Sequence, residues 1–94
     1  MLRLRESVAA ISAALELTSQ ESSPISWAVL QYNLAWCYFE IAKRQPRPIH
    51  VRNSEIAIAN ALAILGPLHS GSLPTDARRL GQEIGKFDLE RAST

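Results

Sequence analysis

The side chains best suited to chemistry are one cysteine and two histidines, and their spacing is typical of no catalytic or metal site. Cys37, His50 and His69 are widely separated, and no carboxylate stands near them at a motif spacing. The HExxH zinc motif, a glycine-rich phosphate loop and the GxSxG nucleophile motif are all absent. A single cysteine also excludes an internal disulfide. We therefore predict no enzymatic activity, cofactor or metal, with Cys37 a small core residue.

A second chemical candidate is a basic segment, which we define as residues 43–52. It contains five basic side chains and no acid: Lys43, Arg44, Arg47, His50 and Arg52. Such a cluster can contact the phosphates of a nucleic acid or another polyanion. No aromatic residues for base stacking are interleaved with it, so the nucleic-acid signal is weak. A solvated connection between helices is the other interpretation, and both stay open here.

The third candidate is an aromatic stripe on the stretch Pro24–Arg44, which reads as a helix. Ser23 suits an N-cap, and Pro24 suits the first helical position, where a missing N–H has no cost. One apolar face comprises Trp27, Leu30, Leu34, Tyr38 and Ile41. A second face, the aromatic stripe, comprises Val29, Tyr32, Trp36 and Phe39. Two apolar faces must be covered from two directions. The aromatic stripe is therefore either core or, as we favour, an apolar groove that binds a partner.

Three further helices are expected around this central one. Apolar residues recur at helical spacing in residues 3–18, 54–65 and 75–91. Two proline-containing loops, residues 45–53 and 66–74, separate the last three helices, and Gly66-Pro67 is a strong stop signal. Gly81 and Gly85 in the last helix indicate either a flat packing strip or a weak helix. The prediction is an all-α domain of four antiparallel helices spanning residues 1–94.

Composition supports a single globular domain and sets limits on its partners. The chain has 94 residues, of which 47% are hydrophobic and 20% charged, which argues against disorder. A net charge of +1 creates no global field that would select nucleic acid or membrane. No apolar run approaches the roughly 18 residues that a membrane span needs. We expect a cytoplasmic protein that does not associate with membranes.

The residue pattern of the first two helices recurs in the last two, and an internal repeat of helix pairs predicts an α-helical solenoid. Four residues of the first helix match four of the third at a spacing of 47 positions: Ser7, Ile11, Ala14 and Leu15 with Ser54, Ile58, Ala61 and Leu62. Three residues of the second helix match the fourth at a spacing of 50: Pro24, Leu30 and Leu34 with Pro74, Leu80 and Ile84.

The stretches VAAISAALEL, PISWAVLQYNLA and IAIANALAIL resemble tetratricopeptide repeats. They are most similar to a bacterial and fungal subset whose helix-A motif reads WAxTQxNLG and whose A and B helices are joined by a longer loop. By this resemblance, residues 24–66 form one full repeat, preceded by a B helix and followed by an A helix or cap. The resemblance covers residues 63–94 weakly, because Ala77 stands where a repeat tryptophan is expected.

The resemblance implies a scaffold that binds other proteins and has no chemistry of its own. Its A helices line a groove, and the groove positions fall on Val29, Tyr32, Trp36 and Phe39. The implied partner is an amphipathic helix, a peptide or a second copy of the chain. Trp36 stands where carboxylate-clamping members of the family carry asparagine, so the resemblance does not imply capture of a peptide carboxylate in this groove.

Overall fold

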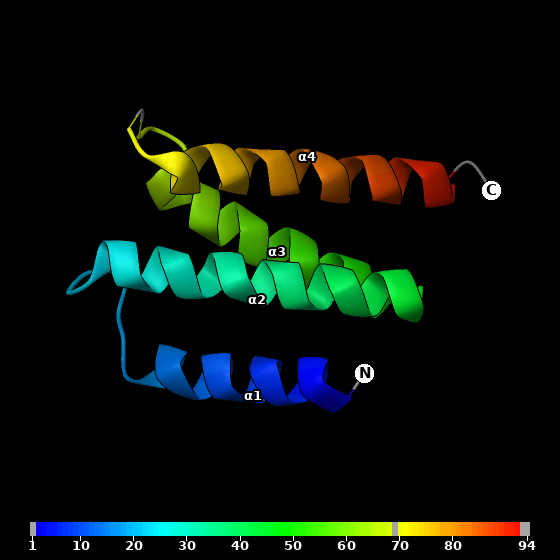
Figure 1. The fold of residues 1–94 in the computed structure, drawn as a ribbon, viewed down its shortest axis with the longest axis horizontal. Helices are drawn as coiled ribbons and strands as arrows, with labels where there is room; N and C mark the ends of the chain where they lie inside the picture. The colour runs from blue at the N-terminus through cyan, green and yellow to red at the C-terminus, as the bar shows by residue number, and fades with distance from the viewer. Residues whose placement is uncertain (1, 69, 93–94) are drawn as a thin grey trace.

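The computed structural model describes residues 2–68 and 70–92. These residues form four helices and no strand: α1 (Leu2–Glu16), α2 (Pro24–Arg44), α3 (Pro48–Leu65) and α4 (Ser72–Ala92). Successive helices alternate in direction (Figure 1). The predicted all-α, four-helix fold is thus confirmed. His69, one of the two histidines considered above, lies outside the described residues.

The bounds of α2 are those that the sequence predicts. Pro24 occupies the start of the helix, and Ser23 precedes it as the N-cap residue. The Ser23 side chain makes no capping hydrogen bond, and instead its main-chain carbonyl accepts from the Trp27 N–H at 2.9 Å. At the other end the Gln45 N–H donates to the Ile41 carbonyl at 2.7 Å. The positive charges of Lys43 and Arg44 in the last turn interact favourably with the negative end of the helix dipole.

Helix α3 begins six residues earlier than predicted, which corrects the expected loop of residues 45–53. Pro48 occupies the first turn of α3, where its missing N–H leaves no bond unmade. Arg47 before it is extended, with φ −98° and ψ 143°, as a residue that precedes proline should be. The basic segment is therefore divided among the end of α2, a short connection and the first turns of α3. In the same way α4 begins at Ser72, and Pro74 lies in its first turn.

The predicted stop at Gly66 is confirmed, although the glycine does not adopt the left-handed conformation common at helix ends. Its φ of −55° is helical, and its N–H donates to the Leu62 carbonyl at 2.8 Å. Arg78 of α4 reaches back to this end. Its Nη1 donates to the carbonyl oxygens of Gly66 at 3.2 Å and Leu68 at 3.4 Å. These bonds satisfy main-chain acceptors that the end of α3 leaves open.

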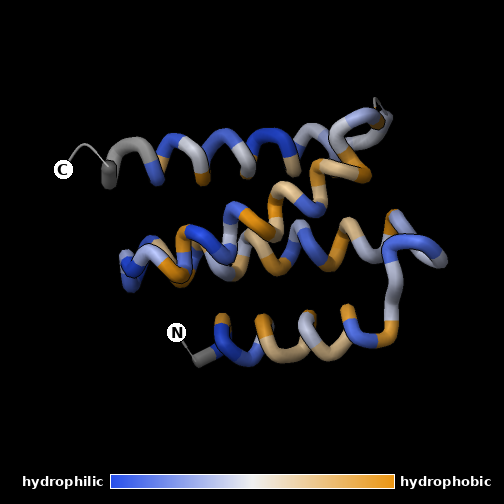
Figure 2. The backbone as a smooth tube through the Cα atoms, turned by 180° about the vertical axis from the view of Figure 1, so that it is seen from behind, coloured by the Kyte–Doolittle hydropathy of each residue, from blue (hydrophilic) through white to orange (hydrophobic). Residues whose placement is uncertain are grey.

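The core lies among α2, α3 and α4, and α2 and α3 form its closest pair. Three alanines on α2, spaced seven apart, have no exposed surface: Ala28, Ala35 and Ala42. Helix α3 is apolar along much of its length, whereas α4 is largely hydrophilic (Figure 2). The buried cluster comprises Ala28, Ala35, Phe39, Ala57, Ile58, Ala61, Leu65, Ala77, Leu80 and Ile84.

Helix α1 is attached more loosely than the other three. It packs on α2, but none of its described side chains, residues 3–16, is buried. The molecule measures 42 × 29 × 18 Å, so it is about two helices thick. Each helix thus packs mainly against its neighbours in sequence, and α2 touches α4 over a short stretch. This arrangement is that of a small helical bundle or solenoid.

The two glycines of α4 provide a matched test of the packing between α3 and α4. A Cβ at Gly81 would lie 3.2 Å from Leu62 Cδ1 and 3.6 Å from Ile58 Cγ1, whereas one at Gly85 would meet nothing within 4 Å. Gly85→Ala should therefore stabilise the fold by about 1 kcal/mol through helix propensity alone, which corresponds to about 4–8 °C in melting temperature.

Gly81→Ala should stabilise the fold less, or destabilise it, because the Leu62 methyl must move to admit the new Cβ. Thermal unfolding followed by circular dichroism measures both variants. Equal gains at the two positions would contradict the close approach of α4 to α3 at Gly81.

Candidate interaction groove

The aromatic residues of the stripe lie beside α4, and the structure divides the stripe into buried and exposed parts. Val29 and Tyr32 are partly buried, and Tyr32 packs against the core cluster. Phe39 is 6% exposed, whereas Trp36 is 47% exposed. The sequence placed all four residues on one face, but only Tyr32, Trp36 and Phe39 line hollows shared with α4, and Val29 lines neither.

Phe39 is a core residue, which corrects its prediction as an open groove position. Its ring meets that of Phe87 on α4 edge to face, with centroids 5.5 Å apart and an interplanar angle of 88°. The Lys43 ammonium lies 4.8 Å from the centroid of the Phe39 ring. Both contacts help to cover the ring. Phe39 reaches the surface only as part of a shallow hollow that it shares with Lys43, Glu83, Lys86 and Phe87.

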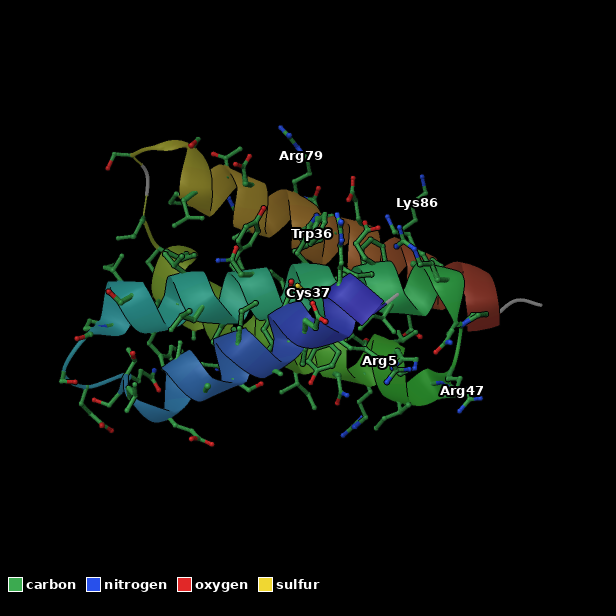
Figure 3. The ribbon with its side chains drawn as sticks, turned by 60° about the horizontal axis from the view of Figure 1, so that its bottom comes forward. Arg5, Trp36, Cys37, Arg47, Arg79 and Lys86 are labelled. Atoms are coloured by element: carbon green, nitrogen blue, oxygen red, sulfur yellow. The ribbon has the colours of Figure 1, made fainter. Side chains whose placement is uncertain are left out.

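Trp36 is the exposed aromatic residue at the seam between α2 and α4. Figure 3 shows it beside α4, with Arg79 and Lys86 pointing outward from that helix. It borders a hollow of about 140 Å³ that is lined by Tyr32, Trp36, Asp76, Arg79, Leu80 and Glu83. We call the two neighbouring hollows, this one and the one at Phe39, the α2–α4 groove.

The α4 wall of this groove carries charges of alternating sign. Asp76, Arg79, Glu83 and Lys86 are spaced three, four and three residues apart, which places them along one face of α4. This charged face was not predicted as a site, although the spacing of its residues can be read from the sequence. Burial raises the pKa of Tyr32, and the negative charge of Asp76 adds to the effect. The Tyr32 hydroxyl therefore stays protonated at neutral pH and can donate a hydrogen bond.

The basic segment is partly neutralised by an acid that precedes it. Glu40 Oε1 lies 2.7 Å from Lys43 Nζ, and Glu40 Oε2 lies 3.0 Å from Arg44 Nη1. The hydrogen bond from Lys43 and the one from Arg44 hold the pKa of Glu40 below its usual value, against the opposing effect of burial. The segment 43–52 itself contains no acid, but Glu40 stands three and four residues before these cations, which is the spacing of helical ion pairs.

The other two arginines of the basic segment are exposed but do not extend this cluster along one element. Arg47 lies in the connection between α2 and α3, and Arg52 lies on α3, where its charge acts on Glu55. Figure 3 places Arg47 at the end of the molecule away from Trp36. The two candidate surfaces predicted from the sequence meet at Lys43, which also lines the hollow at Phe39, whereas neither Arg47 nor Arg52 lines the groove.

Cys37 is buried and free, as the sequence predicts for a core residue. Burial raises the pKa of its thiol, and the negative charge of Glu40 raises it further. A thiol whose pKa is raised carries little thiolate at neutral pH and is a poor nucleophile. Within residues 2–68 and 70–92, no cluster of three or more histidine, cysteine or acidic side chains is placed to hold a metal ion.

Comparison with protein-family models, curated proteins and solved structures finds no match to this chain. In the described part of the chain, no helix combines the length and apolar character that crossing a membrane requires. Fold and site together define a small all-α helical protein with an aromatic, charge-edged groove.

The Glu40 pairs lead to a prediction about pH. Glu40→Gln should lower the stability at pH 7 by about 1 kcal/mol or less, since ion pairs with exposed cations are weak. Because the pKa of Glu40 is depressed in the fold, its contribution is present above the unfolded pKa of about 4.3 and is lost as the pH falls through the folded value. The gap in melting temperature between Glu40→Gln and the parent should therefore close in acid.

Glu16→Gln is the matched control, since Glu16 is exposed at the end of α1. It should change the melting temperature little at either pH. A gap for Glu40→Gln that is constant from pH 7 to the acid range would contradict the ion pairs.

Proposed function

We propose that this chain is a non-enzymatic protein-interaction module of the tetratricopeptide type. It binds an amphipathic helix or peptide of a partner protein, or a second copy of itself, in the α2–α4 groove. The observation that carries the proposal is Trp36, a large aromatic side chain that is 47% exposed beside a hollow. Tryptophan is among the residues most enriched at binding hot spots.

The surroundings of Trp36 support this proposal. Protein interfaces commonly have an apolar, aromatic centre that is surrounded by a polar rim. Here Trp36 and Tyr32 form the centre, and the rim is the charged face of α4, which includes Arg79 and Glu83. Charges of both signs favour a partner helix with complementary charges flanking its apolar face, rather than a uniformly charged ligand.

The alternative function, contact with nucleic acid or another polyanion through residues 43–52, has less support. Two of its four permanent cations, Lys43 and Arg44, already pair with Glu40. Phosphate contacts would give binding a steep salt dependence, whereas an apolar groove gives a shallow one.

The proposed setting is the cytoplasm, where a chain with one free cysteine and no disulfide is typical.

The first test compares Trp36 with Phe39, three residues along the same helix. Trp36→Ala should cost about 1 kcal/mol of stability or less, because half of the side chain is already in water. It should lower binding of the partner, or self-association, by about 30-fold to 1000-fold, the usual effect of losing an anchor. Phe39→Ala should instead cost about 3–5 kcal/mol of folding stability.

Melting temperature and solution mass over a concentration series, measured on the same samples, separate these outcomes. Where the parent is monomeric, helical peptides selected for binding to it provide the second readout. Ile56→Ala is the control, since Ile56 is 50% exposed on α3 and lines neither hollow of the groove. The proposal fails if Trp36→Ala destabilises the fold as much as Phe39→Ala, or if it binds every selected peptide as the parent does.

A second test addresses the alternative function. Changing Arg44, Arg47 and Arg52 together to serine should leave folding and partner binding nearly intact, because exposed charges contribute within about 0.5 kcal/mol each. Circular dichroism and binding of a selected peptide measure the two properties. Loss of binding with retention of the fold would favour the polyanion function over the groove.

A further inference from the structure

A second cleft, of about 300 Å³, lies where α1, α2 and α3 meet. Val8 and Ala9 of α1, Ile41 of α2 and Ile49 of α3 contribute its apolar lining. Ile41 is buried, whereas Ile49 is 57% exposed. The cleft thus has a buried apolar residue at its base and an uncovered apolar side chain at its edge.

The cleft exists because α1 and α3 do not pack against each other. Among the described residues, α1 packs on α2 alone, and α3 crosses α2 obliquely (Figure 1). The two helices that flank α2 therefore diverge and leave Val8 of α1 partly exposed and Ile49 of α3 exposed. Exposed apolar surface that is concave and shared by several elements is characteristic of ligand sites.

One end of the cleft is positively charged. Arg5 of α1 lines it, and its Nη2 donates to Oε1 of Gln45 at 3.3 Å, which holds the guanidinium near the connection between α2 and α3. A guanidinium carries five N–H donors, and this bond uses one of them. His50, in the first turn of α3, also lines the cleft. No acidic side chain lines it among the described residues.

We propose that this cleft binds a small free carboxylic acid with an apolar body. The carboxylate pairs with Arg5, whose planar guanidinium matches the geometry of a carboxylate. The hydrocarbon part lies against Val8 and Ile49, which are not buried by the protein itself. The volume is at the lower end of the ~300–1,000 Å³ typical of small-molecule sites.

Sodium octanoate is the probe, and amide chemical shifts of the isotopically labelled chain are the readout. Octanoate should bind saturably with a Kd of about 1 mM, as expected for a ligand of this size. The shifts should be concentrated at Val8, Ala9 and Ile49. 1-Octanol, which has the same chain without the charge, should bind at least about 10-fold more weakly.

The variants separate the charge from the apolar walls. Arg5→Gln should weaken octanoate binding about 10-fold or more and leave octanol binding unchanged. Arg3→Gln, a change to an exposed arginine on the same helix, is the matched control and should alter neither. Ala9→Leu fills the cleft and should weaken both ligands. Circular dichroism confirms that each variant is folded.

The proposal is overturned if octanoate does not saturate below its micelle concentration, if the shifts map to another surface, or if Arg5→Gln and Arg3→Gln behave alike. It does not depend on the α2–α4 groove, because none of the residues that line the groove lines this cleft. Trp36→Ala should therefore bind octanoate as the parent does, so that failure of one proposal leaves the other standing.

Discussion

The close approach of α2 to α3 is the contact on which the rest of the structure depends. Three alanines spaced seven apart, Ala28, Ala35 and Ala42, present a strip without bulk along α2, and all three are wholly buried. Residues seven apart complete nearly two helical turns, so the strip stays on one face. Ala57 and Ala61 on α3 are also buried. Small side chains on both helices permit a short interaxial distance, and the larger Ile58 of α3 lies close to Gly81 of α4.

This pairing leaves the outer helices with unequal roles. Helix α4 adds Ala77, Leu80 and Ile84 to the core, whereas the described side chains of α1 add no buried residue. A helix with few buried contacts belongs to the less stable part of a fold. The limited contact between helices that are not neighbours in sequence also creates the two concave surfaces. The α2–α4 groove forms where α2 and α4 are in contact over only a short stretch. The cleft at α1 forms where α1 and α3 are not in contact.

The charged residues are arranged in local groups and do not form one surface of a single sign of charge. Glu40 pairs with two cations of its own helix, and Gln31 accepts a hydrogen bond from Asn60 at 3.4 Å across α2 and α3. The pKa of Glu55 is shifted in the opposite direction from that of Glu40. Burial raises its pKa, and the charge of Asp88 raises it further. A raised pKa adds stability that is present in acid and declines as the pH rises through the folded value, which opposes the contribution of Glu40.

The sequence alone determined the helical class and the ends of α2 and α3 at Arg44 and Leu65, because proline, glycine and 3.6-residue periodicity act locally. It misplaced the start of α3, since Pro48 can either end a helix or begin one. Only the tertiary structure decided which aromatic residues are exposed. Phe39 is buried because Phe87 of α4 meets its ring, whereas Trp36, three residues earlier, remains half exposed. Periodicity places residues on a common face, but what covers that face depends on residues distant in the sequence.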